Sequence, residues 1–165
     1  MCAVALARHA GARVIGTVRS SSEEPAARSA GAHDVVLKDQ GLVAGVKTMA
    51  PEGVDHIVEV AFGANLDADI EMLKMGGSIG AYATDNATPK IPFWLLVFKN
   101  ISLFFLGSDD FPAEAKVAAT RDLNDALEKG WPGFEIAESI TLAEIARAHE
   151  LVEHPLLRGR IVVTV

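Results

Sequence analysis

Residues 1–18 read MCAVALARHAGARVIGTV, and this opening decides the fold class. The alanine-rich composition of Met1 to Ala10 predicts a helix, which Gly11 ends. Ala12 to Val18 follows at once as an apolar run typical of a buried parallel strand. A helix that leads into a parallel strand is the second half of a βαβ unit. We therefore expect a sheet that lacks the first strand and the glycine turn where nucleotide phosphates are normally held.

Strands and helices alternate along the rest of the chain with short connections, which predicts an α/β fold with a doubly wound parallel sheet. The further predicted strands are His33 to Leu37, Val54 to Val60, Ser78 to Ala83, Ile101 to Leu106, Phe134 to Ser139 and Ile161 to Val165. One predicted helix begins at a capping serine within Ser20 to Ser22 and ends at Ala30. The other predicted helices are Gly41 to Met49, Asn65 to Met75, Phe93 to Phe98, Pro112 to Lys129 and Leu142 to His154.

Composition excludes several kinds of function. The chain has 165 residues and a formal net charge of −7 without a cluster of lysine and arginine, which argues against a nucleic-acid partner. Cys2 is the only cysteine, so an intramolecular disulfide and a cysteine-rich zinc site are excluded, and a cytoplasmic location is expected. The most apolar stretch, Ile91 to Leu106, is too short to span a membrane and is interrupted by Lys99 and Asn100.

Ligands of an open parallel sheet bind beyond the carboxyl ends of its strands. The first strand is followed by Arg19, Ser20 and Ser21 and by no acidic residue that would accept hydrogen bonds from an adenosine ribose. If a dinucleotide binds, NADP is therefore expected. The alternative is an arginine and serines at a solvated helix start.

Other chemistries find little support in the sequence. Histidines and aspartates such as His33 and Asp34 lie on strands or in loops without the spacing of a metal-ligand motif, so no metal site is expected. No GxSxG elbow is present. Asp109, Asp110 and the scattered glutamates are expected to be solvated at the surface.

A set of motifs runs through the whole chain: AGA at 10–12, AGAH at 30–33, GVD at 53–55, GG at 76–77, and AHE followed by GRIVV near the end. In this order they resemble the C-terminal portion of medium-chain dehydrogenases/reductases, in the zinc-independent NADPH:quinone oxidoreductase (zeta-crystallin-like) branch. The resemblance implies a truncated Rossmann-like NADP-binding domain at residues 1–133. It implies that residues 134–165 return to the catalytic domain.

The resemblance also implies cofactor-binding residues. Arg19 and Ser20 would contact the adenosine 2′-phosphate, assisted by Lys38. The pyrophosphate and nicotinamide regions would be lined by Ala61, Phe62, Gly63, Tyr82, Ala83, Thr84, Leu106, Gly107 and Ser108. No catalytic residue is identified, since the cofactor carries the chemistry in this branch.

The family's glycine-rich turn would lie immediately before Met1, together with a strand between Ala12–Val18 and Val54–Val60. Without that strand, two rows of backbone groups lack partners. We expect these two strands to pair directly, the terminal strand Ile161–Val165 to move inward, or another chain to donate a strand. The terminal strand has lost its usual partners and is expected to pair in a new place or across a dimer interface.

Two functions follow from the resemblance. The first is an NADPH-dependent oxidoreductase of the quinone or enone reductase type, present as a fragment that is inactive alone. The second is a non-catalytic remnant of a dinucleotide-binding fold that acts as a binding or dimerisation module. In either case the apolar strand Ile101–Leu106 is expected to form a homodimer, with burial under the helix Pro112–Lys129 as the alternative.

Overall fold

The structure is a computed structural model that describes residues 2–39, 41–131, 133–154 and 159–165. The predictions that involve Met1 and Pro132 therefore lie partly outside the described residues. The chain divides into two compact units, Ala3–Arg121 and Asp122–Val165. The domain boundary that the sequence predicts after residue 133 stays a prediction.

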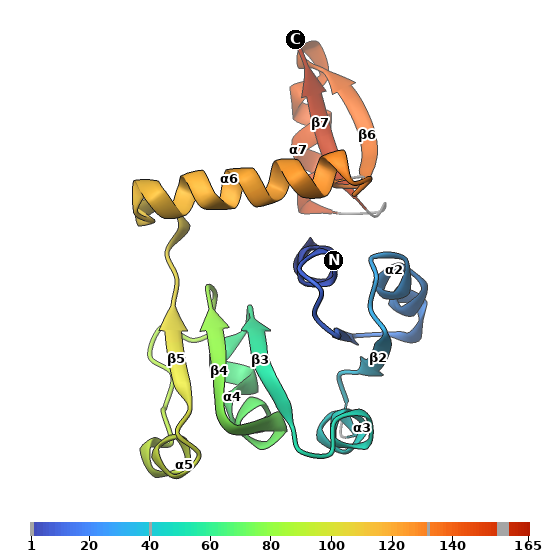
Figure 1. Ribbon diagram of the computed structural model, residues 1–165. Helices are drawn as coiled ribbons and strands as arrows, with labels where there is room; N and C mark the ends of the chain where they lie inside the picture. The colour runs from blue at the N-terminus through green and yellow to red at the C-terminus, as the bar shows by residue number, and fades with distance from the viewer. Residues whose placement is uncertain (1, 40, 132, 155–158) are drawn as a thin grey trace. The chain divides into compact units, whose positions relative to one another are not determined.

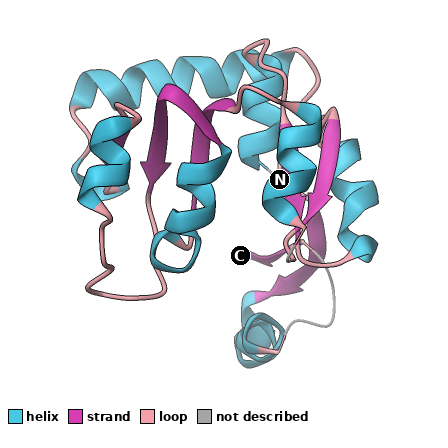
Figure 2. Ribbon diagram, turned by 90° about the horizontal axis from the view of Figure 1, so that it is seen from below, coloured by secondary structure: helices cyan, strands magenta, loops and turns pink. Residues whose placement is uncertain are grey.

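Strands and helices alternate as the sequence predicts, and Figure 2 shows them in contrasting colours. The first unit contains α1 (Cys2–His9), β1 (Ile15–Val18), α2 (Glu24–Ser29), β2 (Asp34–Leu37), α3 (Leu42–Met49), β3 (Val54–Glu59), α4 (Phe62–Met72), β4 (Leu73–Ala81), α5 (Phe93–Phe98) and β5 (Ser102–Phe105). The long helix α6 (Ala113–Glu128) leads into the second unit, which contains β6 (Ile136–Thr141), α7 (Ile145–Glu153) and β7 (Arg160–Thr164). Short 3-10 helices are η1 (Ser21–Glu23), η2 (Ser108–Asp110) and η3 (Leu142–Glu144).

Every strand pair is parallel, as expected for strands joined by helical crossovers. In the first unit β1 pairs with β2, while β3, β4 and β5 form a separate three-stranded sheet in that order. Figure 1 shows these three strands side by side with α4 beside them. The main core lies between α4 and this sheet, where Phe62, Leu66 and Ile70 pack with Ile79.

The central part of the sheet is open. Among the described residues β1 pairs only with β2, and β3 pairs only with β4, so the expectation that β1 and β3 pair directly is wrong. Inward movement of the terminal strand is also wrong, because β7 pairs in parallel with β6. The terminal strand is therefore paired, as expected, and a row of backbone groups on β1 and another on β3 face no strand of the described chain.

Helix α4 corrects two predicted boundaries. It spans Phe62–Met72 rather than Asn65 to Met75, and β4 begins at Leu73 rather than Ser78. The early end has a physical cause, because the Lys99 ammonium donates to the carbonyl oxygens of Ile70 and Leu73, each at 2.6 Å. A cation at these carbonyls compensates for the missing hydrogen bonds of the last turn. Burial lowers the pKa of Lys99.

The predicted serine cap of the helix after β1 is wrong. The Ser20 side chain makes no capping hydrogen bond, and its Oγ lies 2.7 Å from Ser22 Oγ instead. Glu23 stabilises the turn instead, since its Oε2 accepts a hydrogen bond from the Arg19 backbone N–H at 2.9 Å. Among the described residues, no helix is both long and apolar enough to cross a membrane.

Candidate functional site

The predicted residues at the ends of β1 and β2 lie next to each other. The Lys38 backbone N–H donates to the Val18 carbonyl oxygen at 2.7 Å, which places Lys38 beside the start of the Arg19–Ser20 turn. The Arg19 side chain is 85% exposed and forms an ion pair with Glu23 at 3.2 Å. This end of the sheet thus offers an accessible guanidinium to an anion, which would have to compete with the Glu23 carboxylate.

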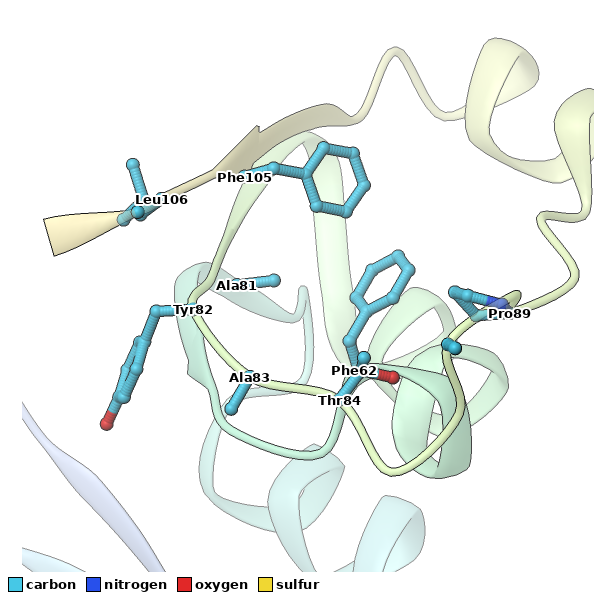
Figure 3. A pocket seen from close by; sticks show the side chains of 10 residues that line it. Phe62, Ala81, Tyr82, Ala83, Thr84, Pro89, Phe105 and Leu106 are labelled. Atoms are coloured by element: carbon cyan, nitrogen blue, oxygen red, sulfur yellow. The ribbon is translucent and has the colours of Figure 1, made fainter. Parts of the chain in front are cut away.

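A second group of predicted residues surrounds a pocket of about 480 Å³ in the first unit. It lies where β4 and β5 end and where α4 begins (Figure 3). Its lining consists of Phe62, Ala81, Tyr82, Ala83, Thr84, Ala87, Pro89, Phe105, Leu106 and Gly107. Six of the predicted residues line it, whereas Arg19, Ser20, Lys38, Ala61 and Gly63 do not. The side chain of Ser108 lies outside the described part of the chain.

One wall of the pocket is aromatic. The rings of Phe62 and Phe105 face each other edge to face, with centroids 5.3 Å apart and planes at 82°. Phe62 is buried at 1% exposure and Phe105 is 63% exposed, so the pair extends from the core to the surface. Tyr82 points away from both rings. The arrangement presents an apolar wall and a polar rim, which suits a flat organic ring.

Four further residues that the sequence did not indicate line the pocket: Ala81, Ala87, Pro89 and Phe105. Phe105 carried a usable signal, because it is the second-last residue of a predicted strand and adjoins Leu106. Ala87 and Pro89 follow β4 in an irregular segment, where sequence periodicity predicts no direction for the chain.

The N-terminus of α4 is closed by the segment after β4. The Phe62 N–H donates to the Ala83 carbonyl oxygen, and the Gly63 N–H donates to Thr84 Oγ1, both at 3.2 Å. A Cβ at Gly63 would lie 2.8 Å from an Asp85 carboxylate oxygen, so the segment packs directly on this turn. The amides that would otherwise bind a phosphate are therefore already used within the chain.

Glu59 contradicts the expectation that the glutamates are solvated, and Asp69 is a second buried acid. Glu59 is 5% exposed and Asp69 is 2% exposed. Burial raises the pKa of Asp69 to about 8, and the neighbouring Glu59 contributes to the same shift. Glu59 lies within the alternating pattern of inward and outward residues on β3, and Asp69 lies among apolar residues of α4. Position within these apolar patterns was the available signal of burial.

No cluster of three or more potential metal-ligating histidine, cysteine, aspartate or glutamate side chains occurs among residues 2–39, 41–131, 133–154 and 159–165. His56 Nδ1 lies 2.7 Å from Ser78 Oγ. Asp34, one of the aspartates considered as a metal ligand, forms an ion pair with Arg13 at 2.8 Å.

A sequence profile of the zinc-binding dehydrogenase family matches residues 1–120. The chain belongs to this family. Its relatives include the quinone oxidoreductase of Rattus norvegicus, with 28% identity over 155 residues that cover 90% of this chain and 46% of the relative. The Homo sapiens quinone oxidoreductase is 25% identical over 93% of this chain and 47% of its own length. This zinc-binding dehydrogenase chain thus spans about half the length of the curated relatives it matches.

The family match and the quinone oxidoreductase relatives confirm the resemblance to the C-terminal portion of medium-chain dehydrogenases/reductases, and solved structures share the fold of this chain. A mycobacterial quinone oxidoreductase has a TM-score of 0.89 at 22% identity, covering 99% of this chain and 52% of the other. A 2-haloacrylate reductase has a TM-score of 0.86 at 24% identity, covering 98% and 52%. A mycobacterial protein solved in complex with NADPH has a TM-score of 0.78 at 22% identity, covering 98% and 52%.

Proposed function

We propose that this chain is the cofactor-binding portion of an NADPH-dependent quinone or enone reductase, without reductase activity on its own. The observation that carries the proposal is the pocket of about 480 Å³, which residues from three separate segments form at the carboxyl ends of β4 and β5. Ligands of parallel α/β sheets bind at this edge. The relatedness to quinone oxidoreductases supports the reaction class.

The residues present fit reduced nicotinamide adenine dinucleotide phosphate (NADPH). The apolar wall of Phe62 and Phe105 matches a flat ring, and Thr84 lines the same pocket. Arg19 and Lys38 bring positive charge to the ends of β1 and β2, where the 2′-phosphate would bind. When bound, NADPH supplies a hydride, and the protein orients the ring and excludes water. The fold-level similarity to a protein solved with NADPH agrees with this cofactor.

The start of α4 supports the absence of activity in the isolated chain. The Phe62 N–H donates to the Ala83 carbonyl oxygen and the Gly63 N–H donates to Thr84 Oγ1, so neither amide is available to stabilise negative charge on a reacting substrate.

The proposal is tested by titrating the purified chain with NADPH while following nicotinamide fluorescence, with NADH as the matched control. Saturable binding at micromolar NADPH and weaker binding of NADH are expected. No change in nicotinamide fluorescence at millimolar NADPH would refute cofactor binding and leave the second candidate function.

That second function is a dimerisation module, and the exposed apolar edge of the sheet favours it. Phe104 and Phe105 of β5 are 53% and 63% exposed, although both lie on a strand. The neighbouring helix α5 exposes Phe93, Trp94 and Phe98. Because exposed apolar edge strands promote pairing with a second chain, we propose a homodimer formed through Ile101–Leu106.

A further inference from the structure

The carboxyl groups of Glu59 and Asp69 are buried directly behind the pocket turn. Glu59 is the last residue of β3, and Asp69 lies on α4, which begins with the pocket residue Phe62. The two side chains are 5% and 2% exposed. One oxygen of Asp69 has no hydrogen-bond partner in the described structure. An ionised carboxylate at such a place would be costly, whereas a protonated one is tolerated.

Glu59 fixes the backbone that leads into the pocket. Its Oε1 accepts hydrogen bonds from the Val60 N–H at 2.6 Å and from the Ala61 N–H at 2.5 Å. The Asn65 amide donates to both Glu59 oxygens at 3.0 Å. These contacts join the end of β3 to the first turn of α4. Because Phe62 follows Ala61 directly, they determine where its ring enters the pocket.

Asp69 completes the pair as a protonated partner. Burial is the main cause of the raised pKa of Asp69, and the neighbouring Glu59 carboxylate adds to the shift, since two ionised carboxylates close together would repel each other. The charged groups that act on Asp69 are Glu59 from β3 and Lys38 from the end of β2. Other cations on or next to the elements that pack against α4 are Lys47, Lys74 and Lys99.

We propose that Glu59 is a positioning residue for the pocket, and that a proton on the buried Asp69 carboxyl beside it keeps the turn from Val60 to Phe62 in place. Loss of this proton places a negative charge on a buried carboxyl next to Glu59, and the cost of burying that charge loosens the turn. The consequence for the cofactor, weaker binding at alkaline pH, rests on the proposed function. Burial of Asp69 raises its pKa to about 8, so the change falls within an accessible pH range.

The first test follows the Val60 and Ala61 amides in nitrogen–proton correlation spectra between pH 6 and pH 9.5. Both amide signals are expected to move with one midpoint near the pKa of Asp69, because both donate to the carboxylate of the pair. Asp69→Asn removes the proton and is expected to abolish this midpoint. Asp67→Asn is the matched control, since Asp67 is an exposed acid on the same helix. Signals that do not titrate in the unmodified chain would overturn the proposal, whether or not Asp69→Asn folds.

The second test measures the NADPH dissociation constant at pH 7 and pH 9. For binding that requires one proton with a pKa near 8, affinity is expected to fall about tenfold over this range. Asp69→Asn is expected to keep the same affinity at both values, and Asp67→Asn to behave like the unmodified chain. Titrating amides in a chain that binds no NADPH would refute the proposed function and leave the role of the carboxyl pair intact. Equal pH dependence in Asp69→Asn and the unmodified chain would refute the link between the pair and the cofactor.

Discussion

At the scale of single residues, Arg19 combines exposure with an acidic neighbour. Its guanidinium is held by Glu23, yet the side chain is 85% exposed and accessible to an anion. A charge-assisted hydrogen bond to a phosphate oxygen would replace the contact with Glu23. Under the proposed function, we therefore expect a preference for NADPH over NADH to depend on this one side chain more than on the pocket, whose lining is mostly apolar.

Arg19→Gln is expected to weaken NADPH binding about tenfold, equivalent to about 1.4 kcal/mol. NADH binding should remain unchanged, because NADH lacks the phosphate. Fluorescence titrations with both nucleotides measure the difference. Arg121→Gln, at an exposed position of α6, controls for the loss of net charge. Equal losses for NADPH and NADH would contradict a role for Arg19 in phosphate recognition.

Asp69 makes the stability of the fold depend on pH. Its pKa is raised in the folded state to about 8, whereas the ordinary value is 3.8. Between these values the folded chain holds a proton that the unfolded chain has lost. The free energy of unfolding contributed by this site is therefore full below pH 4, falls as pH rises, and levels off above pH 8.

Asp69→Asn is expected to remove this contribution. The variant should become more stable relative to the unmodified chain as pH rises from 5 to 8, by up to about 1.4 kcal/mol per pH unit. Urea denaturation at several pH values measures the difference, and Asp67→Asn should show no such trend. Parallel stability curves for Asp69→Asn and the unmodified chain would contradict the burial of an acid with a raised pKa.

At the scale of elements, β5 and α5 leave several large apolar side chains exposed. The Leu106 N–H donates to the Ala81 carbonyl oxygen at 2.9 Å. In a parallel ladder alternate residues bond to the same neighbour, so the backbone groups of Leu103 and Phe105 face outward. Phe104 projects its side chain to the exposed surface, with 53% of its area accessible. This edge has both the unpaired groups and the apolar surface that pairing with a second copy requires.

Phe104→Lys is expected to shift the chain from dimer to monomer, because a charge on an apolar edge strand opposes pairing. Light scattering coupled to size-exclusion chromatography at micromolar concentration measures the mass. Val117→Lys introduces the same charge at an exposed apolar position of α6, and it should leave the mass unchanged. A monomeric unmodified chain would contradict the proposed dimer outright.

At the scale of the whole molecule, the sequence predicted the order of elements because alternating apolar runs and glycine breaks carry that information. Helix α5 was predicted with the bounds that the structure has, Phe93–Phe98. The bounds of α4 were wrong because they depend on Thr84 and Lys99, which are distant in sequence. The GVD motif requires glycine at its first position. Gly53 has a φ of +94°, and a Cβ there would lie 2.5 Å from the backbone nitrogen of Lys74.

The candidate site was predictable only in part. The family resemblance identified Phe62, Tyr82 and Thr84, which follow strands of one parallel sheet, and parallel strands bring their carboxyl ends to one edge. The burial of Glu59 and Asp69 was missed because charge normally indicates exposure, and only packing of β3 against α4 places the two carboxyls together. The pairing of β7 with β6 was also not predicted, since periodicity predicts strands but not their neighbours.

The divided sheet should open in steps. In the described part of the chain, the buried residues of the core cluster beside β1 and β2 are Val18, Ala27 and Ala32, whereas the core beneath β3, β4 and β5 contains larger side chains, including Phe62 and Ile79. Because burial of apolar area dominates local stability, native-state hydrogen exchange is expected to show lower opening free energies for β1 and β2 amides than for β4 amides. Val18→Ala should lower the β1 and β2 values further and leave those of β4 unchanged. Identical opening free energies throughout the first unit would mean that the two sheets unfold as one cooperative body despite the missing strand pairing between them.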